Sequence, residues 1–151
     1  MAQFSYAHAG GKDWREAAQS VVTQLAGATG TLGFLYVTDV VAPQLPDILS
    51  MCRKATGVTH WVGTVGLGVC ATGREYLDEP AVAVMLGDFD PDAFKVFSGI
   101  TDADDVRKVE LRCGGSQAAF ALIHADPTSA QISELVPQLA DKLESGFILG
   151  G

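Results

Sequence analysis

The sequence has few cysteines, few positive charges and no long apolar run, and each shortage excludes a class of protein. Its three cysteines are widely spaced and include no Cys-x-x-Cys pair, which excludes a disulfide framework and a structural zinc site. With 10 basic against 18 acidic residues, the formal net charge is −8, so no basic surface is expected to bind nucleic acid or an anionic membrane. The longest clearly apolar strand, residues 81–86, is too short to span a bilayer.

The first residues contain neither a basic segment nor an apolar core, so we expect no signal peptide. Unpaired thiols then favour the reducing cytoplasm. What the sequence does contain is typical of a folded domain, since 48% of its 151 residues are apolar and 17 are glycine. This length predicts a single domain, residues 1–151, with its own core.

Hydrophobic periodicity predicts an α/β fold in which helices flank a mixed β-sheet. Strands are expected at residues 4–8, 32–38, 58–62, 67–71, 80–86, 95–97, 117–124 and 147–149. A helix begins after the N-cap residue Asp13, a second ends at Gly57, and a third spans residues 129–145 with a kink at Pro137. Residues 102–108 are either a short helix or a solvated loop. The order predicts two similar βαβαβ halves, the first with an added hairpin whose second strand pairs back on the strands before it.

The two halves share a pattern when the numbering is shifted by 87, which overlays residues 32–64 on residues 119–151 without a gap. The aligned pairs include Asp39 with Asp126 and Gly63 with Gly150. A true repeat and the ordinary similarity of two strand–helix–strand units both explain this pattern. A repeat predicts that the domain is incomplete at its C-terminus, and that the strand at 147–149 lies at a sheet edge and favours self-association.

A glycine-rich segment follows the strand at residues 58–62 and contains the candidate ligand-binding residues Gly63, Thr64, Gly66 and Gly68. Its spacing does not match a dinucleotide fingerprint, and no lysine follows it as in a P-loop. Such glycines either let backbone amides approach a ligand, or allow a bulge or close packing against another strand. Both explanations stay open.

Asp39 and Asp126 each follow an apolar strand and precede a helix. A carboxylate in this place caps the helix, or points into a cleft at the carboxyl ends of the strands, where open α/β sheets bind ligands. The two roles are compatible, and both aspartates are candidate ligand-binding residues. Gly150, the counterpart of Gly63, is a further candidate.

Three histidines, His8, His60 and His124, lack the spacing of a metal site, so a structural role is expected for each. His60 is the strongest candidate for a ligand-facing or metal-binding residue, because Trp61 and the glycine-rich segment flank it. Cys70 is a conceivable catalytic nucleophile, but no strand-to-helix turn presents it. The sequence favours a small buried hydrophobic residue at this position.

Taken together, these features resemble the N-terminal part of the FIST sensory domain. The resemblance is carried by residues 13–14, 32–39, 45–49, 57–69, 80–86, 125–127 and 147–151. It implies an input module of signal transduction that binds small molecules such as amino acids, performs no catalysis and needs no cofactor. It also implies signalling partners such as histidine kinases, chemotaxis proteins or cyclic-nucleotide enzymes. The family's domain extends beyond the position that corresponds to Gly151.

The first functional hypothesis is that Asp39, Asp126 and the glycine-rich segment meet in one cleft. Backbone amides there would hold a carboxylate and an aspartate would accept from an ammonium group, which favours zwitterionic ligands. Three alternatives stay open. One is a non-sensing interaction module, because the family that the chain resembles also occurs beside F-box segments. In another, as in a branch of the family, His60 is the axial ligand of haem in a nitric-oxide sensor. In the third, Cys70 serves a cysteine-dependent enzyme.

Overall fold

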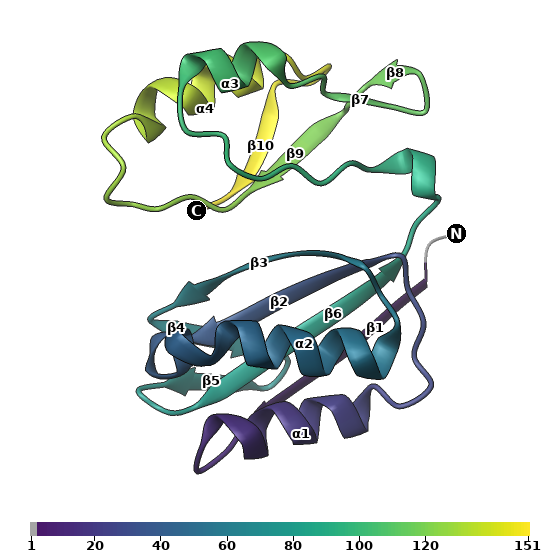
Figure 1. Cartoon of the computed structure of the whole chain (residues 1–151), viewed down its shortest axis with the longest axis vertical. Coiled ribbons are helices and arrows are strands. Elements are labelled where there is room, and N and C mark those ends of the chain that lie inside the picture. The colour runs from purple at the N-terminus through teal and green to yellow at the C-terminus, as the bar shows by residue number, and fades with distance from the viewer. Residues whose placement is uncertain (1–2) are drawn as a thin grey trace. The chain divides into compact units, whose positions relative to one another are not determined.

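The computed structural model describes residues 3–151, which form two compact units (Figure 1). Unit 1 ends at Phe89, and unit 2 is Asp90–Gly151. The chain is a mixed α/β structure in which helices flank a mixed sheet, which confirms the predicted fold class. Within residues 3–151, no helix has the length and apolar character needed to cross a membrane.

Unit 1 contains a four-stranded mixed sheet with the order β1-β6-β2-β3. These strands are β1 (Gln3–Gly10), β2 (Leu32–Thr38), β3 (His60–Gly66) and β6 (Ala81–Asp88). β6 is antiparallel to both β1 and β2, whereas β2 and β3 are parallel. β1, β2 and β3 therefore run in the same direction and end at one border of the sheet, which we call the carboxyl edge.

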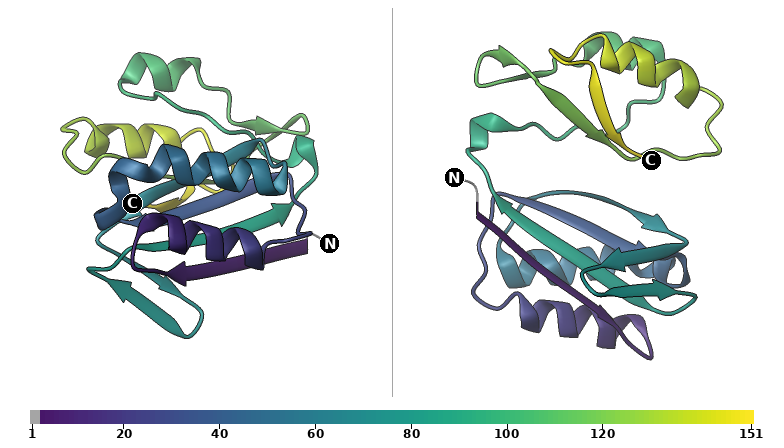
Figure 2. Two further views of the ribbon diagram at one scale, coloured as in Figure 1. Left: turned by 60° about the horizontal axis from the view of Figure 1, so that its bottom comes forward. Right: turned by 180° about the vertical axis from the view of Figure 1, so that it is seen from behind.

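Helices α1 and α2 cover one face of this sheet, and a short hairpin lies on the other (Figure 2). The bounds are α1 (Trp14–Gln24), η1 (Asp39–Gln44), α2 (Leu45–Thr56), β4 (Gly68–Ala71) and β5 (Arg74–Leu77). The helices bury small and branched side chains completely, among them Ala17, Val21 and Ile48. Full burial of one such valine or isoleucine stabilises the fold by about 1.5–3 kcal/mol.

The helix ends of unit 1 lie where local signals predict them. Asp13 is the N-cap of α1, because its carboxylate accepts a hydrogen bond from the backbone N–H of Glu16 at 2.9 Å. α2 carries Pro46 in its first turn and ends at Gly57, whose φ of 73° lies in the left-handed region that favours glycine.

The position of β6 in the sheet differs from the prediction. The sequence predicts that residues 80–86 pair back on the strand at residues 67–71, whereas β4 pairs with β5 and β6 lies between β1 and β2. The fully buried Thr38 at the end of β2 contributes a contact that supports this arrangement. Its hydroxyl donates to the carbonyl of Glu79 (2.7 Å) and accepts from the backbone N–H of Ala81 (3.1 Å), which holds the start of β6 beside β2.

Unit 2 is built around a two-stranded parallel sheet. Its elements are η2 (Pro91–Ala93), α3 (Ala103–Lys108), β7 (Arg112–Cys113), β8 (Ser116–Gln117), β9 (Phe120–Ile123), α4 (Ile132–Ala140) and β10 (Phe147–Gly150). Val106 of α3 and two leucines of α4 form the core of this unit, against which Ile148 of β10 packs. Of the two structures expected for residues 102–108, a short helix or a loop, the helix is the one that forms, as α3.

One expected strand of the second half is not formed. Residues 95–97 have no strand structure, and Val96 and Phe97 are 37% and 42% exposed. No neighbouring strand buries these side chains, so the apolar run by itself does not produce a strand. The second half therefore consists of a short hairpin, β7–β8, followed by the βαβ unit from β9 to β10.

The two βαβ units resemble one another closely at one point. Gly63 of β3 is the register partner of Leu35, and Gly150 of β10 is the register partner of Ile123. A Cβ atom added at either glycine would lie 1.8 Å from the carbonyl oxygen of its partner. Gly63 follows its partner by 28 residues and Gly150 by 27, so the overlay of the two halves contains a one-residue gap that the sequence comparison did not show.

Candidate functional site

The carboxyl edge of unit 1 brings together part of the predicted site. Thr38 and Gly66, the last residues of β2 and β3, are register partners. Asp39 follows Thr38 directly, and Gly68 begins β4 two residues after Gly66. Thr64 lies two residues further back along β3. This border of the sheet is the kind at which open α/β structures bind ligands.

Asp39 is exposed and does not cap the helix that follows it. It is the first residue of η1, whose N-cap position is held by Thr38 without a side-chain hydrogen bond to the helix. The capping role predicted for Asp39 is therefore wrong. Its exposed carboxylate at the carboxyl edge is compatible with the other predicted role, contact with a ligand.

Close packing accounts for the glycines in β3 and at the start of β4. A Cβ atom at Gly63 would overlap the carbonyl oxygen of Leu35, and one at Gly68 would lie 2.4 Å from the side chain of Leu77. At Gly66 the nearest atom would be the carbonyl oxygen of Gly68, at 2.8 Å. The structure thus supports the packing explanation at these three positions, and ligand binding by the segment stays a prediction.

Asp126 and Gly150 form a similar arrangement within unit 2. β9 and β10 end together, and Asp126 follows three residues after β9. Its carboxylate accepts hydrogen bonds from the hydroxyl (2.7 Å) and the backbone N–H (2.8 Å) of Thr128, and both bonds lower the pKa of Asp126. The N-cap position of α4 is held by Gln131, so the predicted capping of this helix by Asp126 is wrong. The expected site residues therefore fall into two groups, one within each unit.

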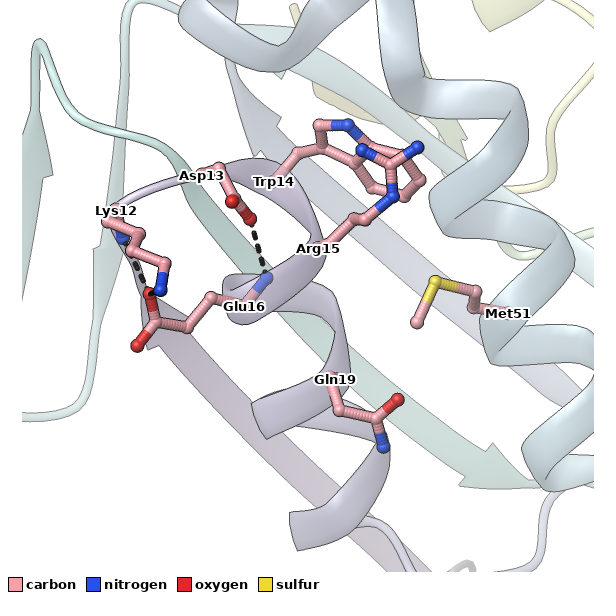
Figure 3. Close-up of a pocket in the computed structure, with 7 residues that line it drawn as sticks. All are labelled: Lys12, Asp13, Trp14, Arg15, Glu16, Gln19 and Met51. Atoms are coloured by element: carbon pink, nitrogen blue, oxygen red, sulfur yellow. Dashed lines mark hydrogen bonds and ion pairs between the residues drawn. The ribbon is translucent and has the colours of Figure 1, made fainter.

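A pocket that the sequence did not reveal lies at the start of α1 (Figure 3). It is wide open to solvent, and five of its seven lining residues are exposed. Its volume is about 520 Å³, and its lining is Lys12, Asp13, Trp14, Arg15, Glu16, Gln19 and Met51. Met51 of α2 points toward the first turn of α1 across the pocket (Figure 3). α1 begins four residues after the end of β1, so its first turn lies near the carboxyl edge.

The pocket carries charges of both signs. The Glu16 carboxylate accepts from the backbone N–H of Lys12 (3.1 Å) and lies 4.0 Å from the Lys12 Nζ. The hydrogen bond from the Glu16 backbone lowers the pKa of Asp13. The Arg15 guanidinium lies 4.3 Å from the centroid of the Trp14 ring, and no carboxylate of residues 3–151 is within ion-pair distance of it. Arg15 is therefore an oriented cation that is available to an anionic group.

The family model of the FIST N domain matches residues 31–151, which is most of the chain. The chain belongs to the FIST N domain family. FIST N domains are sensory domains of signal transduction, and the family is not one of enzymes. The match begins just before β2, so residues 12–19 of the pocket lie outside it, whereas Asp39 and the glycine-rich segment lie inside. None of the curated proteins matches this chain.

The resemblance to FIST proteins suggested haem binding through His60, and the surroundings of His60 do not fit this group. His60 is the first residue of β3 and the register partner of Leu32, six residues and about 20 Å along the strand from Gly66. Its side chain is exposed, whereas a haem iron ligand needs an apolar pocket that encloses the macrocycle. His60 is thus separated from the carboxyl edge, and haem binding stays a prediction without structural support.

The cysteines of this FIST N domain differ from the expectation at one position. Cys70 is exposed on β4, so the prediction of a small buried residue is wrong. It lies opposite Glu75 in an antiparallel hairpin and not at a strand-to-helix turn of the kind that presents a catalytic thiol. Cys52 is buried, and burial raises the pKa of its thiol to about 11. Residues 3–151 contain no cluster of three or more His, Cys, Asp or Glu side chains that could hold a metal ion.

His8 has a structural role, as predicted. Its Nδ1 lies 2.7 Å from the hydroxyl of Tyr76, a side chain that is only 2% exposed. The guanidinium of Arg74 lies 4.6 Å from the centroid of the Tyr76 ring and 3.4 Å from the carboxylate of Glu79. The contact between His8 and Tyr76 connects the β4–β5 hairpin to β1, and Arg74 packs on the tyrosine from within β5.

Proposed function

We propose that this FIST N domain senses a free amino acid or a closely related zwitterion and passes the signal to a partner protein. The observation that supports this ligand class is the pocket at the start of α1, which offers an available cation, carboxylates and an apolar surface within one turn of helix. The partner is a histidine kinase, a chemotaxis protein or a cyclic-nucleotide enzyme, the classes that the FIST resemblance implies.

The groups of the pocket match the parts of an amino acid. Arg15 presents a planar guanidinium that pairs with a carboxylate through two parallel hydrogen bonds. Glu16 accepts from an ammonium group, in exchange for its long and exposed pair with Lys12, which contributes little stability. Trp14 and Met51 offer an aromatic ring and a thioether to the ligand's side chain.

The carboxyl edge offers a second place for the same ligand. Asp39 would accept from the ammonium group, and the backbone amides around Gly66 and Gly68 would hold the carboxylate. Both places lie in unit 1, and they differ in the side chain that would bind the ligand first. Arg15 makes the first place attractive to the carboxylate, and Asp39 makes the second attractive to the ammonium group.

Calorimetric titration with each of the common amino acids tests the proposal. We expect saturable heats for a subset of them, and a loss of roughly tenfold or more in affinity for Arg15→Ala, because a charge-assisted bidentate contact is removed. Lys54→Ala, which removes an exposed cation of α2 outside the pocket, is the matched control and leaves the affinity unchanged. Affinity that depends on Asp39→Asn and not on Arg15→Ala would assign the ligand to the carboxyl edge. Flat heats for every amino acid would contradict the ligand class.

A further inference from the structure

β3 is an edge strand of the four-stranded sheet of unit 1, and none of its residues is acidic, lysine or arginine (Figure 1). Its seven residues read His-Trp-Val-Gly-Thr-Val-Gly, and within residues 3–151 the strand is paired with β2 alone. Folded proteins protect such borders with lysines, prolines or bulges, because the unpaired backbone groups attract a further strand. Although the net charge of the chain is −8, β3 contains none of its acidic residues, lysines or arginines.

The opposite border of the sheet is protected by the protein's own side chains. The carbonyl of His8, in the border strand β1, accepts a hydrogen bond from the side-chain amide of Gln24 in α1 at 3.1 Å. The imidazole of His8 is held by Tyr76 of the hairpin. β1 is therefore partly satisfied by local partners. In β3 the carbonyl of Val65 accepts a hydrogen bond from the hydroxyl of Thr64 at 3.3 Å, and no second strand of residues 3–151 pairs with β3 on the side away from β2.

The sequence of β3 is complementary to itself when two copies are antiparallel and centred on Gly63. Such a pair places Val62 opposite Thr64 of the partner subunit, and Trp61 opposite Val65 of the partner subunit. Trp61 then lies opposite a smaller valine, Val62 lies opposite a threonine of similar size, and the bare Gly63 backbones meet at the symmetry axis. Antiparallel pairing of this kind is isologous and closes as a dimer.

The faces of the two sheets also match in this arrangement. Trp61 and Val65 pack toward the helix-covered face of their own sheet, so the alternating Val62 and Thr64 lie on the opposite face. When the pair is centred on Gly63, side chains of the helix-covered face lie opposite side chains of that same face in the partner, and the same holds for the other face. The helices of both copies therefore lie on the same side of one continuous sheet.

We propose that β3 is a homodimerisation strand, which joins two copies of this chain into an eight-stranded sheet through antiparallel β3–β3 pairing. The partner is a second copy, because antiparallel pairing about Gly63 matches the faces of the two strands and opposes no like charges. This interface is separate from the ligand pocket at α1, whereas the second ligand place at the carboxyl edge shares Gly66 with it. Pairing of the two β3 strands does not itself require a ligand, so the dimer does not depend on the proposed function.

Sedimentation velocity of the 151-residue chain over a range of concentrations tests the proposal. The wild-type chain is expected to form a dimer in reversible equilibrium with the monomer. The double variant Val62→Lys/Thr64→Lys places lysines opposite each other in both copies, and we expect its dimer dissociation constant to rise by roughly tenfold or more. The double variant Val62→Glu/Thr64→Lys places opposite charges there, and the dimer is restored.

The control is Phe4→Lys/Tyr6→Lys, two exposed positions of β1 on the same open face of the sheet. This variant keeps the dimer if β3 is the interface and loses it if two sheets stack face to face. A monomeric wild type, a dimer that survives the two lysines in β3, or a dimer that the charge-reversed variant fails to restore would each overturn the proposal. Should the lysine variant misfold, amide hydrogen exchange of the wild type decides, because only the dimer makes the β3 amides exchange more slowly at high concentration.

Discussion

At the scale of single residues, Gly63 and Gly150 show how close packing between strands dictates sequence. Each has a positive φ, 152° and 118°, and each would place a Cβ atom on the carbonyl oxygen of a neighbouring strand. The same requirement recurs in both βαβ units, so these two glycines are explained without a ligand. A ligand-binding role at the carboxyl edge therefore depends on residues such as Asp39, which packing does not explain.

Gly63→Ala is expected to lower the free energy of unfolding by about 3 kcal/mol, since the strand pair β2–β3 must separate to admit the methyl group. The matched control is Gly27→Ala, a glycine with a φ of 80° around which a Cβ atom meets nothing within 4 Å. Backbone strain alone costs about 1 kcal/mol at the control position. Urea denaturation measures both variants, and an equal loss in the two would show that the overlap with Leu35 is not the cause.

Asp126 links one side chain to the acid sensitivity of unit 2. The hydroxyl and the backbone N–H of Thr128 lower its pKa in the folded state, so the carboxylate stabilises the fold above the unfolded-state pKa of about 4. This contribution is lost as the pH falls through the lower, folded-state value. We expect Thr128→Ala to raise the pKa of Asp126 toward its ordinary value, as measured by NMR titration. An unchanged titration would show that the hydroxyl is not the main cause.

At the scale of elements, the parts of the fold set by local signals could be predicted from the sequence. The cap at Asp13 and the left-handed glycine at Gly57 fix helix ends through contacts within four residues. The place of β6 is instead held by contacts between residues far apart in the sequence, such as the bond from the Ala81 N–H to Thr38 across 43 residues, and the pocket depends on Met51 meeting α1. Periodicity contains no information on such pairings. It places the aspartates and glycines at strand ends, but not the charged pocket beside them.

Thr38→Val is the sharpest test of how β6 is held. Valine has nearly the same shape, so the change removes the hydroxyl and leaves the Ala81 N–H and the Glu79 carbonyl without it. We expect a loss of about 1–3 kcal/mol in the free energy of unfolding, because buried polar groups are left unsatisfied. In Thr23→Val the exposed hydroxyl, which binds a carbonyl of its own helix, is lost with little effect. Similar losses of unfolding free energy in both variants would mean that the burial of Thr38 does not increase the contribution of its hydroxyl to stability.

At the scale of the whole molecule, the net charge of −8 separates the two proposals. Each copy repels the next, and the uncharged β3 strands gain nothing from ions when they pair. Ligand binding, in contrast, depends on ion pairs with Arg15 and Glu16, which salt screens. The same change in ionic strength should therefore act in opposite directions on self-association and on ligand affinity.

We expect higher salt to strengthen the dimer, because screening weakens the repulsion between two acidic copies over distances of about 10 Å. Over the same range, the affinity for an amino acid falls, because exposed charge pairs lose part of their attraction. Sedimentation velocity and calorimetry on one preparation, at low and at high sodium chloride, measure the two trends. A dimer that dissociates as salt rises must be held by ion pairs, and β3 has none to offer. That result would move the interface to another surface of the FIST N domain and leave the ligand proposal untouched.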